Sequence, residues 1–129
     1  MTCFWDGIIK SLTIEDFQTI GHFKGKPNAK EFANFLKSKN KLIENVIWQN
    51  TELSKQEQQE CFDAINELDI NSIRNGYFCS SCDPFLLLLC ELFCIHIIHK
   101  YNGNILEYKH KQINRKTIIY QSSKSHFWN

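Results

Sequence analysis

The segment formed by residues 83–101 constrains the fold of this chain more than any other. Asp83-Pro84 is a strong helix start, because the carboxylate caps the first turn and proline fits the first helical position. Residues 85–93 are apolar almost all round, which is typical of a helix buried on every side. Residues 95–101 are rich in β-branched side chains and predict a strand. The sequence therefore predicts a helix sandwiched in the core and a strand directly after it.

Length and composition favour one ordered domain over residues 1–129. Hydrophobic residues make up 43% of the chain and charged residues 22%, which excludes wholesale disorder. The formal net charge of +1 argues against a protein that binds nucleic acid mainly by charge. No export signal opens the chain, and its most apolar run is shorter than the about 20 residues that a membrane helix needs. We therefore expect no membrane association, and free thiols in the cytoplasm or another reducing intracellular compartment.

Four helices are expected before this segment, over residues 3–12, 28–39, 42–48 and 54–68. In the first, Phe4 and Ile8 share one helical face, and Gly7 lets a neighbouring element approach closely. Asn28 is the expected N-cap of the second helix. Ser54 begins the fourth helix with the spacing of a capping box.

A small antiparallel sheet is expected in the second half of the chain. Asn102-Gly103 is the preferred two-residue hairpin turn, so the strand over 95–101 is expected to pair with a second over 104–108. Residues 117–120 predict a third strand. The expected fold class is α+β, with N-terminal helices packed on this sheet.

Cys3 is the first candidate for chemistry. It lies in the first turn of the expected first helix, where the helix N-terminus favours an anion and therefore the nucleophilic thiolate. A thiol nucleophile needs a base, and His126 lies just after the last expected strand. A cysteine on a helix N-terminus and a histidine on a sheet is the arrangement of papain-like thiol hydrolases. We expect the first helix to lie against the C-terminal strand and to bring Cys3 within about 4 Å of His126.

Two short motifs and the order of elements resemble the ovarian-tumour (OTU) domain, a family of cysteine peptidases that cleave ubiquitin conjugates. Cys3-Phe4-Trp5 is similar to the opening of the family's nucleophile helix, and His126-Phe127 to its terminal histidine–aromatic pair. Asn75-Gly76-Tyr77-Phe78 resembles the element before its buried helix, and residues 28–39 look like the helix that follows the nucleophile helix. The resemblance covers nearly the whole chain.

The resemblance implies an OTU-like fold and a deubiquitinase-type cysteine peptidase. Its partner would be ubiquitin or a ubiquitin-like protein, and its hydrolysis of the thioester intermediate would need no cofactor or metal. Cys3 would be the nucleophile, with its backbone N–H in the oxyanion hole. His126 would be the general base and acid, and Asn129 would orient the imidazole.

The chain departs from the family pattern in two places. The third triad residue usually lies two positions after the histidine, which is Trp128 here, and Asn129 comes one position later. Only Met1 and Thr2 precede Cys3, where the family has a loop that helps to bind the oxyanion. The alternative is therefore a catalytically inactive binding or structural module on the same scaffold.

A zinc-stabilised interaction domain is the third interpretation. Cys79-Ser-Ser-Cys82 has ligand spacing, and Cys90 and Cys94 lie four residues apart on the expected buried helix. Buried free cysteine in such an apolar run behaves as a small hydrophobic residue, so we expect no stoichiometric zinc. His96 and His99 fall on opposite faces of the expected strand and do not converge on one ion.

Basic residues flank the expected hairpin and offer a contact for phosphate or an acidic partner. Solvated strand ends commonly have this composition, so nucleic acid is not the expected partner. These residues are Lys100, Lys109, His110, Lys111, Arg115 and Lys116.

Overall fold

The computed structural model describes residues 2–20, 25–77, 79–122 and 127–128, the last two by their backbone alone. The helices, which include the 3₁₀-helix η1, are α1 (Cys3–Ser11), α2 (Ile14–Ile20), α3 (Ala29–Ser38), α4 (Lys55–Glu67), η1 (Ile70–Asn75) and α5 (Pro84–Phe93). The strands are β1 (Val46–Trp48), β2 (Thr51–Glu52), β3 (His96–Tyr101), β4 (Asn104–His110), β5 (Thr117–Ser122) and β6 (Phe127–Trp128). The expected α+β class is confirmed.

Within the described residues the strands form one six-stranded sheet in the order β2-β1-β4-β3-β5-β6. The expected hairpin of β3 and β4 turns at Asn102 and Gly103, which have φ of 48° and 84° as a two-residue hairpin turn requires. β3 and β5 are parallel, so the expectation of a wholly antiparallel sheet is wrong and the sheet is mixed. Residues 111–116 carry the chain past the start of β3 to its far side, which makes β5 run in the direction of β3.

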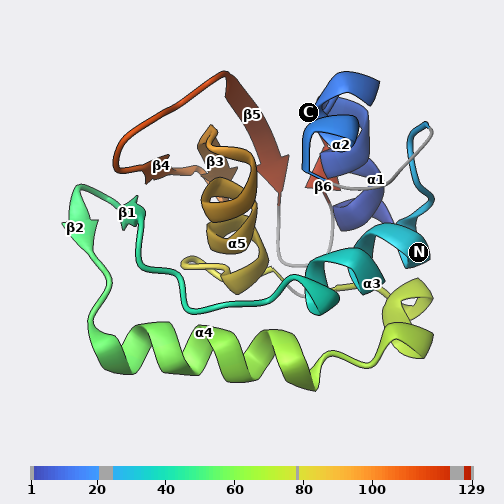
Figure 1. Ribbon diagram of the computed structural model, residues 1–129, viewed down its shortest axis with the longest axis horizontal. Helices are drawn as coiled ribbons and strands as arrows, with labels where there is room; N and C mark the ends of the chain where they lie inside the picture. The colour runs from blue at the N-terminus through green and yellow to red at the C-terminus, as the bar shows by residue number, and fades with distance from the viewer. Residues whose placement is uncertain (1, 21–24, 78, 123–126, 129) are drawn as a thin grey trace.

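Helix α5 is sandwiched in the core, as predicted. It packs against β1, β3 and β4 on one side and against α2, α3 and α4 on the other, as Figure 1 shows. Asp83 caps the helix by accepting from the amides of Phe85 and Leu86, with Pro84 in the first turn. The leucines and Cys90 of its centre are fully buried.

The helices around α5 also begin where the capping residues predicted. Asn28 and Ser54 each take part in a complete capping box at the start of α3 and α4. α2 was not expected, because Phe17 is the only apolar residue that it buries. The Phe17 ring meets that of Phe32 edge-on, at a centroid distance of 5.4 Å. No helix in the described part of the chain combines the length and the apolar composition that crossing a membrane requires.

The helix expected over residues 42–48 is wrong, because residues 46–48 form β1. Apolar spacing in this stretch fits a helix, but Val46 and Trp48 pair instead with His110 and Tyr108 of β4. Gln49 and Asn50 then adopt positive φ of 51° and 63°, and the chain turns back into β2. Pairing with a distant strand therefore overrides the local pattern.

Candidate functional site

Cys3 is the first residue of α1, and its side chain is partly buried against the core. Thr2 occupies the N-cap position, but its hydroxyl donates to the Asp6 carboxylate at 2.6 Å instead of capping the helix. The first-turn amides of a helix have no acceptor within the helix itself. The Thr2 hydroxyl therefore does not cap the amides at the start of α1.

Two hydrogen bonds fix the direction of α1 relative to β5. Lys116 Nζ donates to the carbonyl of Ser11 at 3.1 Å, and the Tyr120 hydroxyl donates to that of Gly7 at 3.1 Å. Tyr120 thus contacts α1 at the backbone of Gly7. The later residue, Tyr120, contacts the earlier residue of the helix, so β5 runs antiparallel to α1. The end of β5 at Ser122 therefore lies toward the Cys3 end of the helix (Figure 1).

The C-terminal strand lies against the same helix. β6 packs on α1 and pairs with β5, with Phe127 opposite Ser122. The expectation that the first helix lies against the C-terminal strand is therefore confirmed. His126 and Asn129 lie outside the described residues, so the contact of Cys3 with His126 and the part played by Asn129 stay predictions.

A cleft of about 490 Å³ opens at the start of α1. Thr2 and Asp6 line this cleft. Cys3 lies next to them around the helix, on the side toward Gly7, which Tyr120 contacts. Its other walls are the first turn of α3 and the 3₁₀-helix η1. They contribute Asn28, Ala29, Lys30, Ile70, Asn71, Ile73 and Arg74. Sequence reasoning missed this cleft, because three segments far apart in the chain converge to form it.

Four other thiols are held in the protonated form by burial. Burial is the main cause that raises the pKa of Cys61 to about 11 and that of Cys82 to about 12, and nearby carboxylates add to it. Burial also raises the pKa of Cys79 and that of the fully buried Cys90 far above the ordinary range. A protonated thiol is a weak nucleophile, so these four cysteines are poor candidates for the reactive group.

A buried cysteine–histidine contact was not predicted. Cys79 Sγ lies 4.0 Å from His99 Nε2, which also contacts the Ser122 hydroxyl at 2.5 Å. Burial lowers the pKa of His99 to about 4, so the imidazole is neutral at pH 7. The exposed fraction of these three residues is 5% or less, so a substrate does not reach them. The cluster fills the core beneath the end of β5.

The cysteines and histidines considered as zinc ligands do not come together at one site. No group of three or more His, Cys, Asp or Glu side chains able to hold an ion occurs among the described residues. Cys90 is a core residue, as predicted, whereas Cys94 is the C-cap of α5 and only partly buried, so that half of the expectation is wrong. His96 is partly exposed and His99 fully buried, so the two histidines occupy opposite faces of β3, as expected.

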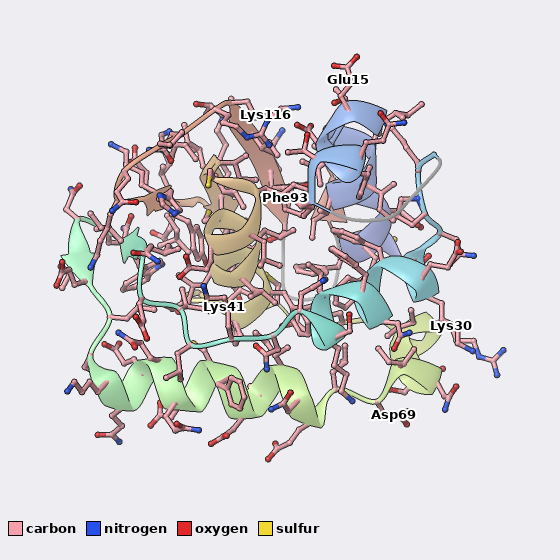
Figure 2. The ribbon with its side chains drawn as sticks, in the orientation of Figure 1. Glu15, Lys30, Lys41, Asp69, Phe93 and Lys116 are labelled. Carbon is pink, nitrogen blue, oxygen red and sulfur yellow. The ribbon has the colours of Figure 1, made fainter. Side chains whose placement is uncertain are left out.

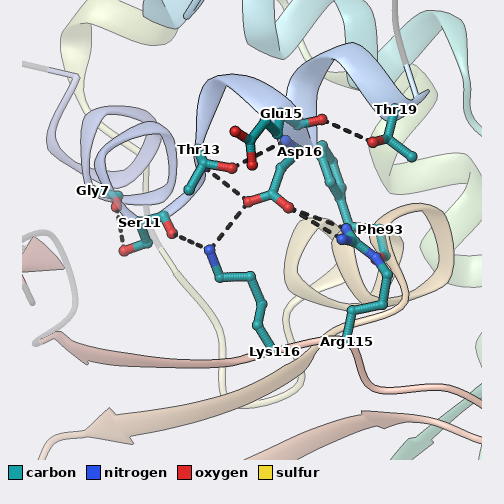
Figure 3. A network of polar contacts seen from close by, with 9 residues as sticks. All are labelled: Gly7, Ser11, Thr13, Glu15, Asp16, Thr19, Phe93, Arg115 and Lys116. Carbon is teal, nitrogen blue, oxygen red and sulfur yellow. Dashed lines mark hydrogen bonds and ion pairs between the residues drawn. The ribbon is translucent and has the colours of Figure 1, made fainter.

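The basic stretch near the hairpin is largely used in internal ion pairs. Arg115 and Lys116 both reach the buried Asp16 carboxylate, at 3.3 and 3.1 Å (Figure 3). Lys111 pairs with Glu52 of β2 at 2.8 Å. These three cations therefore tie the 111–116 turn to α2 and β2, which leaves less positive charge for a nucleic acid.

Comparison with known proteins adds no further assignment. No family model, no curated protein and no solved structure matches the chain. The interpretation of the site therefore depends on the residues and their geometry.

Proposed function

We propose that this protein is an OTU-like cysteine peptidase that acts on conjugates of ubiquitin or a ubiquitin-like protein. One observation carries the proposal: α1, which begins at Cys3, packs on β6, which begins at the residue after His126. The antiparallel course of α1 and β5 supports it, since both strand ends that flank residues 123–126 lie toward the Cys3 end of the helix.

The chemistry would be acyl transfer followed by hydrolysis. His126 takes the thiol proton of Cys3, and the sulfur attacks the substrate carbonyl carbon. The first-turn amides of α1, including that of Cys3, stabilise the negative charge on the carbonyl oxygen. The imidazolium then gives its proton to the leaving amine, and water hydrolyses the thioester that remains on Cys3. Asn129 orients the imidazole in this scheme.

A ubiquitin derivative with an electrophile at its C-terminus tests the proposal. Wild-type protein is expected to form a covalent adduct, and Cys3→Ala is expected to abolish it. Cys82→Ala is the matched control, because it removes a partly buried thiol of raised pKa and leaves labelling unchanged. Mass spectrometry of the digested adduct identifies the modified cysteine.

The base is tested through the pH dependence of the same labelling. His126→Ala is expected to slow labelling strongly at pH 7 and less at pH 9, where hydroxide removes a thiol proton without help. Asn129→Ala is expected to have a smaller effect than His126→Ala. Folded wild-type protein that forms no adduct would refute the peptidase and leave the inactive binding module as the interpretation.

A further inference from the structure

The two faces of the sheet differ in what covers them. Side chains alternate between the faces along each strand, and the fully buried Tyr108 and Tyr120 mark the inner face. Both helices that pack on the sheet lie on this side, since the Tyr108 hydroxyl accepts from the Asp83 amide at the start of α5 and the Tyr120 hydroxyl donates to Gly7 of α1. The outer face of β3, β4 and β5 consists of His96, Ile98, Lys100, Ile105, Glu107, Lys109, Thr117, Ile119 and Gln121.

The outer face carries apolar side chains where an open sheet is ordinarily polar. Ile98 lies directly opposite Ile119 of β5, and Ile105 lies diagonally from Ile98 on β4. Ile105 and Ile119 are 60% and 49% exposed. Three neighbouring isoleucines in the middle of the sheet therefore meet solvent in the monomer.

Four of the outer residues form a quadrilateral on β3 and β4. Ile98 is paired with Glu107, and Lys100 is paired with Ile105. The two isoleucines thus occupy one diagonal of the quadrilateral, and Lys100 and Glu107 occupy the other. His96 Nε2 lies 3.8 Å from Glu107 Oε2, but burial lowers the pKa of His96, so at pH 7 the imidazole is neutral and the carboxylate keeps its charge.

This quadrilateral is complementary to itself. In a two-fold dimer, a residue that contacts a second residue of the partner is matched by the reverse contact. With the axis along the isoleucine diagonal, Ile98 and Ile105 each meet their own counterparts, and Lys100 of each copy meets Glu107 of the other. The strands of the two copies then cross steeply, as in orthogonal sheet packing. The same rotation places Lys109 over β5, whose outer residues are uncharged, so it brings no lysine onto another.

We infer that the outer face of the sheet binds a second copy of this chain in a two-fold dimer. Charge complementarity selects this occupant, because an acidic surface would repel Glu107, a basic surface would repel Lys100, and an apolar one would desolvate both without pairing them. The inference does not rest on the proposed function, since α1 and Cys3 lie on the other side of the sheet.

The size of the face sets the expected affinity. At a strand spacing of about 4.8 Å and a rise of about 3.3 Å per residue, the outer residues of β1, β4, β3 and β5 cover about 300 Å² in projection. Stable complexes bury about 800 Å² per partner, so the dimer is expected to be weak, with Kd between about 10 µM and about 1 mM. Sedimentation velocity over this range of protein concentration measures the Kd.

Charge reversal tests the pairing of Lys100 with Glu107. Lys100→Glu and Glu107→Lys each place like charges against one another at two points of the dimer, and each is expected to weaken it at least about tenfold. The double variant exchanges the two charges and is expected to restore the wild-type Kd. Circular dichroism confirms that each variant is folded.

Two further variants locate the interface. Lys41→Glu is the matched control for charge, because Figure 2 shows Lys41 on the segment between α3 and β1, among the helices, and it is expected to leave the Kd unchanged. Ile105→Lys places two like charges on the axis and is expected to abolish dimerisation; Ile105 is exposed, so this change does not threaten folding.

A wild-type protein that stays monomeric at about 1 mM would overturn the inference. So would a dimer that Ile105→Lys does not weaken, because that dimer would form through another surface. A double charge variant that is no tighter than the single variants would reject the proposed pairing and the two-fold axis with it. An equal loss with Lys41→Glu and Lys100→Glu would show that net charge, rather than this face, controls association.

Discussion

Asp16 is expected to stabilise the fold through its charge, and the structure sets the size of the effect. Its carboxylate has 6% of its side-chain surface exposed. Asp16 Oδ2 accepts from the Thr13 amide at 2.8 Å and from Lys116 Nζ at 3.1 Å, while Oδ1 accepts from both terminal nitrogens of Arg115 at 3.3 Å (Figure 3). Asp16→Ala removes all of these contacts at once.

In Asp16→Ala the Thr13 amide at the start of α2 loses its acceptor. The loss of this capping interaction lowers the free energy of unfolding by about 1 kcal/mol. Lys116 and Arg115 are 29% and 37% exposed, so solvent screens their ion pairs with Asp16. Each pair then contributes about 0.5 kcal/mol. We therefore expect Asp16→Ala to lower the free energy of unfolding by about 2 kcal/mol and Tm by about 6–10 °C.

The pH dependence follows from the pKa of Asp16. Burial raises this pKa, but the hydrogen bonds from Thr13 and Lys116 and the charge of Lys116 outweigh burial, so the net shift is downward. A carboxyl with a lowered pKa in the folded state stabilises the fold above its unfolded pKa of about 3.9 and loses that effect as pH falls through its folded pKa. The stability difference between wild type and Asp16→Ala is therefore expected to be full at pH 7 and to shrink below about pH 4.

Urea unfolding followed by circular dichroism at pH 7 and at pH 3 measures this difference. Asp63→Ala is the matched control, because it removes an exposed α4 carboxylate that accepts a hydrogen bond from the side chain of Gln59. That control is expected to change stability by less than about 0.5 kcal/mol. A difference for Asp16→Ala that equals the control, or one that keeps its full size at pH 3, would refute the reasoning.

Two other predictions concern the same helix and the buried thiols. Tyr120→Phe removes the hydrogen-bond donor to the Gly7 carbonyl, so it is expected to lower the free energy of unfolding by about 1 kcal/mol. It is also expected to slow adduct formation at Cys3. Unchanged unfolding and labelling would show that this hydrogen bond does not hold α1 in place. Cys61 and Cys82, with pKa values raised to about 11 and 12, are expected to react with iodoacetamide at pH 8 at least about tenfold more slowly than in urea, as peptide mass spectrometry can measure. Equal rates in the folded protein and in urea would contradict the claim that burial protects the Cys61 and Cys82 thiols.

Local signals in the sequence were sufficient for the elements that carry their own start and stop residues. Asp83-Pro84 correctly predicted the start of α5, and Asn28 and Ser54 the starts of α3 and α4. Asn102-Gly103 correctly predicted the hairpin, because few residue pairs adopt two successive positive φ values. Each of these signals acts within a few residues of the chain.

Features that depend on distant partners could not be predicted in this way. β1 is a strand because β4 is available to pair with it, and the parallel pairing of β3 and β5 depends on how residues 111–116 cross the sheet. The cleft at the start of α1 needs that helix, the start of α3 and η1 together, and no one of these segments indicates it alone. The position of Cys3 in the first turn of a helix was predicted correctly because it is a local property, whereas the residues that surround Cys3 come from distant parts of the chain.

The hydrogen bond between Tyr120 and Gly7 joins residues 113 positions apart, and α1 rests on strands from the opposite end of the chain. Contacts of such long range form late in folding, because closing a large loop costs entropy before the contact repays it. During synthesis, α1 leaves the ribosome long before β5 and β6 exist. We therefore expect α1 to reach its native packing only after β5 and β6 have been synthesised.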